Sequence, residues 1–332
     1  MKEHKDKEMM TETRRDFIKK SALLCAWASL PSGFITPVKA AQPSYKTRDP
    51  KNALVLYYSQ TGLTARYGRL TACTLKAKGL LVDYVDMQTF HKDRLGQYDL
   101  IIVGSPVFYY DIPSNVRDWL GTIPKITGTP VAAFVSFGGP EGNQRNAVCR
   151  SLGLLAAAGG VPAALGMFRS IPAYPTPAWD SDNQRSAEHL PDSATYDAVR
   201  LFSCQILERI AAGESIPFEM QPAVREYLRY LPLIWFNKKA ISKHTVDAGK
   251  CISCGTCVKK CPVAAIRPEK QFVDRDKCLA CFGCLNNCPA DAVVMDYAGK
   301  RLYGFLQYLK RRKITILEPP EFQGCSFDPK TV

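Results

Sequence analysis

Cysteine is the residue type with the clearest chemical pattern in this 332-residue chain. Eight of its 13 cysteines lie between residues 251 and 288, in two runs that begin 27 residues apart and share the pattern C-x2-C-x2-C-x3-C-P. The residues after the two prolines also match, as VAAI at 263–266 and ADAV at 290–293. Thiolates are ligands for soft metals, and three of them spaced two residues apart can surround one compact centre in a tight loop. The repeat therefore predicts two metal-binding loops of the same design.

Two other uses of clustered cysteines fit this repeat less well. Structural zinc takes four ligands from two separated C-x2-C pairs, and it has no use for a third and fourth cysteine in each run. A disulfide framework is compatible with an exported chain but does not require the same spacing twice. We therefore expect no zinc in this segment.

The repeat, with a proline after each fourth cysteine, resembles the bacterial two-cluster ferredoxins over residues 248–296. This resemblance implies two 4Fe–4S clusters, with the fourth cysteine of each run ligating the cluster of the other run. The ligands implied for the first cluster are Cys251, Cys254, Cys257 and Cys288. The ligands implied for the second are Cys278, Cys281, Cys284 and Cys261.

A hydroxyl-rich loop, SQTGLT at residues 59–64, is the second group with evident chemistry. It stands between an apolar run at 53–58 and a helical pattern that stops at Gly79. Such a turn presents N–H groups and hydroxyls to an anion, and the dipole of the following helix adds a favourable field. The loop has no lysine and no G-x-G-x-x-G spacing, which excludes a P-loop and a dinucleotide fingerprint. It predicts one terminal phosphate held by neutral donors, the alternative being an ordinary strand–helix turn.

The elements that must position this loop alternate between strands and helices. The pattern predicts strands near residues 53–58, 80–85, 99–104, 130–135 and 161–168. It predicts helices near residues 63–78, 113–120, 143–158 and 194–212, while 87–98 leave room only for a short one. Short apolar strands separated by helices are typical of a parallel sheet buried on both faces, with right-handed crossovers.

Two later loops also follow strands, and with the SQTGLT loop they occur in the order expected of a flavodoxin. Residues 51–212 resemble the flavodoxin family in this respect. The resemblance implies an α/β fold, a doubly wound five-stranded parallel sheet of order 2-1-3-4-5 with FMN at its carboxyl edge. It implies that Ser59, Thr61, Gly62 and Thr64 cradle the phosphate, with Gln60 and Leu63 as cofactor-binding residues of the same loop. It places Ser105, Pro106, Val107, Phe108 and Tyr109, and Ser136, Phe137, Gly138 and Gly139, beside the flavin ring.

Three further expectations concern this flavodoxin-like region. Phe108 or Tyr109 is the best candidate to stack on the flavin. The proline-rich stretch 171–193 is an insertion that could cover it. The cysteines in its helices (Cys73, Cys149 and Cys204) are expected to be buried free thiols. A nucleophilic role is not expected for them, because no histidine stands in a recognisable motif.

The N-terminus has the order of an export signal. Arg14 and Arg15 are followed by Phe17, then by an apolar stretch at 21–35 and by small residues before Ala41. The segment 1–40 resembles a twin-arginine signal peptide, which implies export to the periplasm with cofactors inserted beforehand in the cytoplasm. The alternative is a helix that happens to begin with an arginine pair.

The rest of the chain is a connector and a basic tail. Residues 213–247 are rich in aromatics at helical spacing and predict a helical linker that packs between the domains. In the tail, residues 297–332, six basic residues lie among apolar ones between positions 300 and 313, in a chain of formal charge +13. An acidic redox partner or an anionic membrane surface suits this tail, or it is a solvated face. We expect no nucleic acid for an exported protein.

The whole layout resembles fused flavodoxin–ferredoxin proteins. In this layout a small α+β two-cluster domain follows the flavodoxin-like domain. It predicts an electron-transfer iron–sulfur flavoprotein that couples two-electron FMN chemistry to one-electron transfer through two clusters. One alternative is a flavin-dependent reductase that has its own small substrate and uses the clusters to conduct electrons. Another is a ferredoxin with a vestigial flavodoxin scaffold. An electron carrier is favoured over an enzyme with its own substrate.

Overall fold

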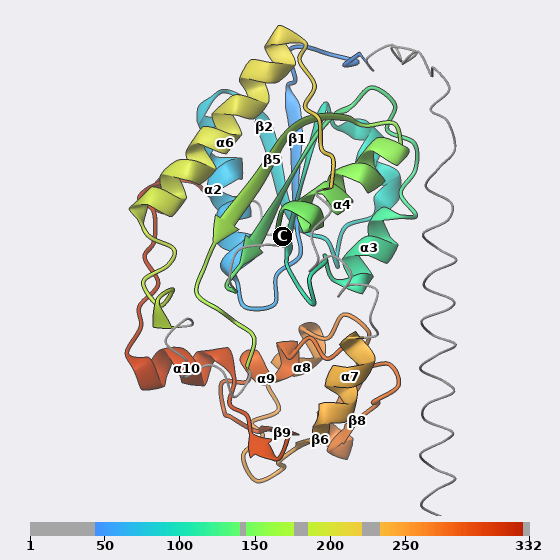
Figure 1. The fold of residues 1–332 in the computed structure, drawn as a ribbon. Helices are drawn as coiled ribbons and strands as arrows, with labels where there is room; N and C mark the ends of the chain where they lie inside the picture. Colours follow the sequence, from blue (N-terminus) through green and yellow to red (C-terminus); the bar gives the residue numbers. More distant parts are fainter. Residues whose placement is uncertain (1–43, 140–143, 176–184, 221–232, 328–332) are drawn as a thin grey trace, which may run out of the picture. The chain divides into compact units, whose positions relative to one another are not determined.

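A computed structural model describes residues 44–139, 144–175, 185–220 and 233–327 (Figure 1). The predicted signal segment 1–40 lies outside these residues, as do parts of the insertion and of the linker. None of the helices described is both long and apolar enough to span a membrane. Residues 43–332 form one compact unit. We refer to residues 44–220 as the flavodoxin-like region and to residues 233–302 as the cysteine-rich region.

A five-stranded sheet forms the centre of the flavodoxin-like region. Its strands are β1 (Asn52–Tyr57), β2 (Leu81–Asp86), β3 (Leu100–Pro106), β4 (Pro130–Phe137) and β5 (Val161–Arg169). All are parallel, in the order β2-β1-β3-β4-β5, so the predicted topology is confirmed. The order changes direction between β1 and β3, which leaves a crevice at the carboxyl ends of these two strands.

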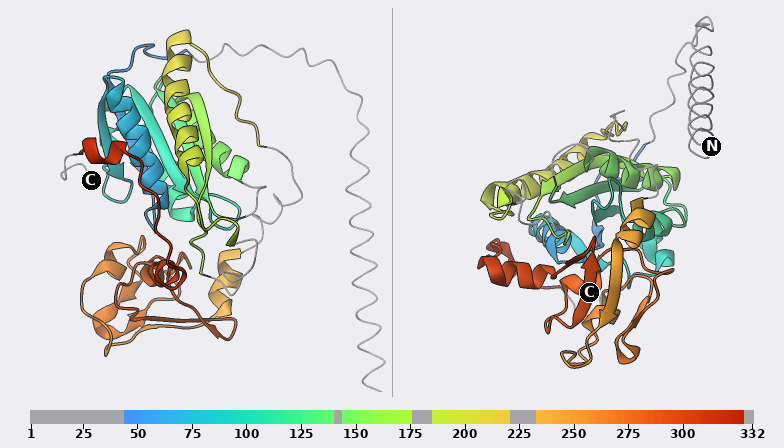
Figure 2. Two further views of the ribbon diagram at one scale, coloured as in Figure 1. Left: turned by 90° about the vertical axis from the view of Figure 1, so that its left-hand side faces the viewer. Right: turned by 60° about the horizontal axis from the view of Figure 1, so that its bottom comes forward.

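Helices cover both faces of this sheet because alternate side chains of each strand point to opposite faces. The helices are α2 (Leu63–Ala77), α3 (Ser114–Leu120), α4 (Gln144–Ala157) and α6 (Ser193–Ala212), with a short 3-10 helix, η1 (Lys92–Gln97), after β2. Along β1, Val55 faces the core shared with α2 and α6, whereas Leu54 and Leu56 face the core shared with α3 and α4. The pairing of α2 with α6 on one face is visible in Figure 2.

The cysteine-rich region begins with helix α7 (Leu233–Ala240) and contains two small antiparallel sheets. Strands β6 (Ile241–Val246), β9 (Val293–Tyr297) and β10 (Lys300–Arg301) form one, in the order β10-β9-β6, and β7 (Ile266–Arg267) pairs with β8 (Phe272–Val273) in the other. Two one-turn helices, α8 (Thr256–Lys259) and α9 (Gly283–Asn286), and a 3-10 turn, η4 (Pro268–Lys270), complete it. A small α+β fold therefore follows the flavodoxin-like sheet, as predicted.

The linker differs from its prediction. Residues 241–246 form a strand and not a helix, because Ile241 and Val246 are buried through pairing with β9. Trp235 and Phe236 are 53% and 51% exposed, so the expectation that these aromatics pack between the domains is wrong for this pair. Tyr227 and its neighbours lie outside the described residues.

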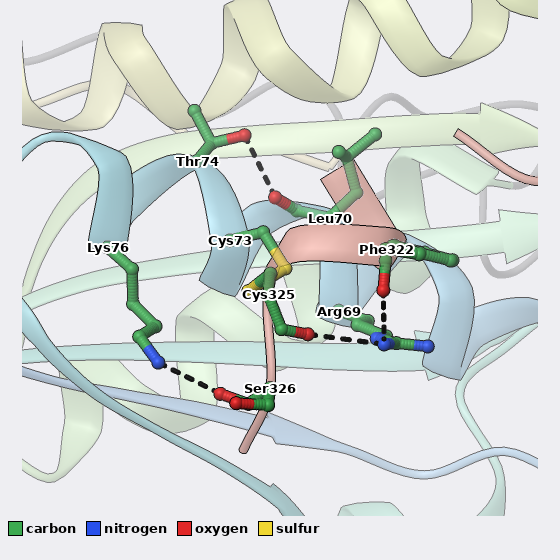
Figure 3. Close-up of a disulfide and its surroundings, with 8 residues drawn as sticks. All are labelled: Arg69, Leu70, Cys73, Thr74, Lys76, Phe322, Cys325 and Ser326. Atoms are coloured by element: carbon green, nitrogen blue, oxygen red, sulfur yellow. Dashed lines mark hydrogen bonds between the residues drawn. A yellow bond between two sulfur atoms is a disulfide. The ribbon is translucent and has the colours of Figure 1, made fainter. Parts of the chain in front are cut away.

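The C-terminal segment returns to the flavodoxin-like region. It contains α10 (Phe305–Arg312) and α11 (Glu321–Gly324), and a disulfide joins Cys325 to Cys73 of helix α2, with 5.8 Å between their Cα atoms (Figure 3). Arg69 donates hydrogen bonds to the carbonyls of Phe322 and Cys325, and Lys76 donates one to Ser326. The expected free thiol at Cys73 was therefore wrong, since its partner lies 252 residues away in sequence. Cys149 and Cys204 are free, and Cys149 is buried.

Candidate functional site

Loops from three predicted segments meet at the carboxyl edge of the sheet and surround a cavity of about 580 Å³. The residues of these loops that line it are Gln60, Thr61, Leu63, Thr64, Pro106, Val107, Phe108, Tyr109, Ser136, Phe137, Gly138 and Gly139. The remaining three residues predicted for the site do not line it: Ser59, Gly62 and Ser105. The topology of the sheet brings these loops together, because β1, β3 and β4 are neighbours and end at the same edge.

The three residues that do not line the cavity shape its loops. Gly62 has a φ of 85° at the start of α2, a conformation that favours glycine. Its N–H donates to the Oγ of the buried Ser59 at 3.1 Å, which closes the turn from behind. Ser105 is fully buried, and its hydroxyl donates to the carbonyl of Pro106. The hydroxyls of Ser59 and Ser105 therefore hold the backbone of these loops in place.

Hydroxyls of two different loops meet beside the cavity. The Oγ1 of Thr64 lies 2.6 Å from the Oγ of Ser136, and both side chains are buried. Each hydroxyl both donates and accepts, so the pair can turn one proton toward an anion while remaining bonded to each other. This contact fixes the spacing of the first and third loops.

The insertion after β5 supplies another wall. Residues 170–174 line the cavity, which agrees with the expectation that this stretch covers the site; residues 176–184 lie outside the described part. A Cβ added to Gly138 would lie 2.4 Å from the Cα of Pro172, so only glycine allows the third loop to approach the insertion this closely.

Tyr109 connects the second loop to the cysteine-rich region. Its hydroxyl donates to the carbonyl of Ala280 at 2.7 Å, and burial raises the pKa of Tyr109 far above its usual value. Both Tyr109 and Tyr110 have positive φ angles, 49° and 67°, which cost energy in residues with a Cβ and are maintained here by surrounding contacts. The ring of Phe108 carries no polar group and remains the simpler candidate for stacking.

The lining of the large cavity fits FMN. Phe108, Tyr109, Phe137 and Tyr174 supply aromatic surface for a flat ring, and Thr61, Thr64 and Ser136 supply hydroxyls. None of its described lining residues is Asp, Glu, Lys, Arg or His, so a phosphate there would meet neutral donors, as the sequence predicts. The Oε1 atom of Gln60 is buried without a hydrogen-bond partner.

Two further cavities are each lined by four cysteines. One is bounded by Cys251, Cys254, Cys257 and Cys288. The other is bounded by Cys261, Cys278, Cys281 and Cys284. These are the crossed sets that the ferredoxin resemblance implies. The cysteines surround a hollow and do not converge on one point, and among the described residues no group of His, Cys, Asp and Glu is arranged around a single ion. The two hollows differ in size, about 380 Å³ beside the first set and about 20 Å³ beside the second.

The backbone repeats as closely as the cysteines do. Positive φ angles occur at equivalent positions of the two runs, at Ser253 and Ala280 and again at Gly255 and Phe282. After each fourth cysteine, the amide four residues on donates to the cysteine sulfur, at 3.1 Å in one run and 3.2 Å in the other. N–H groups directed at sulfur stabilise the thiolate form that binds metal.

The two cysteine sets differ in exposure. Cys254 is exposed, and a hydrogen bond with Thr256 lowers its pKa. Burial raises the pKa of Cys281 to about 12 and that of Cys284 well above its usual value. Without metal these buried thiols are protonated at neutral pH, so loading a metal there must displace protons.

His244 is a neighbour of the second set that sequence reasoning missed. Its Nε2 lies 3.3 Å from the Sγ of Cys284. Burial lowers the pKa of His244 to about 4, so the imidazole is neutral at pH 7. No spacing in the sequence signals this contact, because β6 and α9 meet only through the tertiary fold.

The large cavity and the second cysteine set share a wall. Cys281 lines both, and Asn286 of α9 also lines the large cavity. Neither residue was predicted for the flavin site. Tyr110, Gln144 and Asn237 also line it and were likewise missed.

Two protein families match separate parts of the chain. Residues 54–175 match the flavodoxin domain, and residues 243–289 match the 4Fe-4S dicluster domain. The chain therefore joins a flavodoxin domain, which implies FMN, to a 4Fe–4S domain. It is an electron-transfer protein of the flavin and iron–sulfur class.

Solved structures resemble the first part of the chain. A flavodoxin from the domain Archaea is 18% identical, with a TM-score of 0.36, and the match covers 48% of this chain and 98% of that one. Flavodoxin 2 from Bacillus cereus is 21% identical, with a TM-score of 0.38 and coverage of 48% and 99%. The rubredoxin oxygen:oxidoreductase of Desulfovibrio gigas is 19% identical, with a TM-score of 0.39 and coverage of 51% and 38%. No curated protein matches the chain.

Proposed function

We propose that this protein couples FMN, bound in the large cavity, to two 4Fe–4S clusters bound by the two crossed cysteine sets. The observation that carries the proposal is the position of Cys281, which lines both the large cavity and the second cysteine cavity. An electron-transfer protein needs its cofactors in close proximity, and a shared wall provides it.

FMN exchanges one or two electrons, whereas an iron–sulfur cluster exchanges one electron at a time. Together the two cofactors can split an electron pair into single electrons or combine single electrons into a pair. The chain itself contributes binding and enclosure. Neutral hydroxyls of the first and third loops receive the phosphate, aromatic side chains receive the ring, and residues 170–174 shield it from water. Tyr109 fixes the second loop to the cysteine-rich region through its bond to Ala280.

We also propose that the protein acts outside the cytoplasm after twin-arginine export. The Cys73–Cys325 disulfide supports this, because disulfides persist in the periplasm and are rare in the cytoplasm. The arginine pair Arg14 and Arg15 supports it from the sequence.

The partner we propose is an acidic redox protein that docks beside the first cysteine set. Cys254 is exposed there next to Ile252, which is 65% exposed, and Lys250 and Lys259 flank the loop. The C-terminal tail is less suited to this role than its sequence indicated. Within it, Arg301 and Arg312 pair with carboxylates of the chain, and Arg311 lies 4.1 Å from the ring centre of Tyr303.

Cofactor analysis tests the proposal. The protein should be purified without oxygen, and its iron, sulfide and FMN measured per chain. Two clusters and one flavin correspond to about eight iron ions, eight sulfides and one FMN. Zinc in place of iron would overturn the cluster assignment, and iron without FMN would leave the flavodoxin domain as a scaffold.

A further inference from the structure

The two cysteine runs provide an internal comparison. Their backbones match, but the second run has Gly283 where the first has Thr256, and Asn286 and Asn287 where the first has two lysines. A cluster-binding loop of this shape therefore does not itself require glycine or asparagine at these positions. Another part of the structure must explain them.

Gly283 is explained by the first loop of the flavin cavity. Its φ angle is not positive, so its backbone conformation would accept any residue. A Cβ at this position, however, would lie 1.8 Å from the Oε1 of Gln60 and 3.0 Å from the carbonyl oxygen of Lys260. The side chain of Gln60 therefore occupies the space that a larger residue at Gly283 would need.

Asn287 contacts the same loop through a hydrogen bond. Its Nδ2 donates to the carbonyl of Gln60 at 2.6 Å and to the carbonyl of Gly283 at 2.8 Å. Asn286 makes the corresponding bond to the insertion, donating to the carbonyl of Ala173 at 2.9 Å. The equivalent residue of the first run, Lys260, has a flexible, charged side chain in place of an amide.

Gln60 connects these contacts to the cavity. It is 4% exposed and lines the cavity, and its Nε2 donates to the hydroxyl of Tyr58 at the end of β1. Gln60 is therefore held from two sides, by β1 of the flavodoxin-like region and by α9 of the cysteine-rich region.

We propose that Gly283 and Asn287 are positioning residues for the flavin phosphate loop. In this arrangement the helix that follows Cys281 sets the conformation of residues 59–64, and FMN affinity depends on residues of the cluster-binding segment. The inference rests on the proposed binding of FMN in the large cavity, and it assigns part of that binding to residues more than 200 positions away in the sequence.

The test measures FMN release from the full-length protein containing both cofactors. Free FMN fluorescence in a dilution series gives the dissociation constant, while iron and sulfide content reports the clusters. Gly283→Ala should weaken FMN binding about tenfold or more, because overpacking displaces Gln60. Asn287→Ala should weaken it about threefold to tenfold through one lost hydrogen bond. Both variants should keep their iron and sulfide.

Two matched controls isolate the effect. Gly96→Ala adds a methyl group at an exposed glycine with open space around it, and Gln97→Ala removes an exposed side-chain amide of η1. Neither should change FMN affinity or cluster content.

A double-mutant cycle identifies the route of the effect. In a Gln60→Ala background the clash with Gln60 is absent and only the 3.0 Å contact with the carbonyl of Lys260 remains, so Gly283→Ala should cost much less affinity than it does in the parent. Equal losses in both backgrounds, or parental affinity in both Gly283→Ala and Asn287→Ala, would overturn the inference. If Gly283→Ala fails to fold, Asn287→Ala decides alone. A parent protein that binds no FMN would instead refute the proposed function.

Discussion

At the scale of single residues, the flavin site is built from neutral side chains. A hydroxyl that donates to a phosphate makes a hydrogen bond to a charged group, worth about 1.5–3 kcal/mol. Thr61→Ala should therefore weaken FMN binding roughly tenfold to 150-fold. Gly62→Asp should abolish binding, because it adds a like charge to the loop whose residues Thr61 and Leu63 line the cavity and places a side chain at a φ of 85°. Titration with FMN checks both, and unchanged affinity in Gly62→Asp would refute the phosphate-loop assignment.

His244 offers a second prediction at this scale. A neutral imidazole with its proton on Nε2 donates to the sulfur of Cys284, 3.3 Å away, and hydrogen bonds to ligand sulfurs stabilise the more negative, reduced cluster. His244→Leu removes the bond and should lower one cluster potential by about 20–60 mV, the equivalent of about 0.5–1.5 kcal/mol for one electron. A redox titration followed by electron paramagnetic resonance measures this shift. The exposed His91→Leu serves as the control, and two unchanged potentials would contradict the role of His244.

The two sets of grouped cysteines and the three loops around the large cavity could be predicted from sequence because their signals are local spacings. Gly283, Asn287 and His244 could not, because their roles arise only where α9 meets the phosphate loop and where β6 meets α9. A residue whose partner is set by tertiary contact leaves no periodic or spacing signal of its own.

At the scale of elements, the sequence predicts the strands of the five-stranded sheet correctly. It does not predict that residues 241–246 form the strand β6, or that the C-terminal segment returns to the flavodoxin-like region. The strands of the flavodoxin-like region other than β2 are mostly apolar and are followed by turn residues, so their type and order can be predicted from the sequence. β6 has only two buried apolar residues, Ile241 and Val246, and becomes a strand through pairing with β9. The disulfide partner of Cys73 could not be predicted from the sequence either, because the two cysteines are 252 residues apart.

The C-terminal segment carries the prediction at this scale. Its helix α10 packs Phe305 and Tyr308 against Leu63 of the phosphate loop and Ile171 of the insertion, and the disulfide fastens the end of the segment to α2. Cys325→Ser should lower the free energy of unfolding by about 2–5 kcal/mol, since a cross-link restricts the unfolded chain. Thermal unfolding should show a reduced Tm that reductant does not lower further. Cys204→Ser, at a free cysteine, should leave the Tm near that of the parent.

At the scale of the whole molecule, the proposed export would separate formation of the disulfide and insertion of the cofactors into different compartments. Twin-arginine export carries folded proteins, so clusters and flavin would be inserted in the cytoplasm, where thiols are kept reduced. The disulfide between Cys73 and Cys325 would then form only after export. The state of this cysteine pair therefore reports where a given molecule has been.

This ordering gives the last prediction. Arg14→Lys combined with Arg15→Lys keeps the charge but removes the planar guanidinium groups that a receptor can recognise. The variant should remain uncleaved in the cytoplasm with iron and FMN bound and with Cys73 and Cys325 as thiols, whereas the periplasmic parent should carry the disulfide. Fractionation followed by thiol alkylation and mass spectrometry measures both properties. Lys5→Arg with Lys7→Arg, the control, should be exported normally. Periplasmic yield equal to the parent would refute the twin-arginine assignment, and a disulfide in the retained variant would refute the order of assembly.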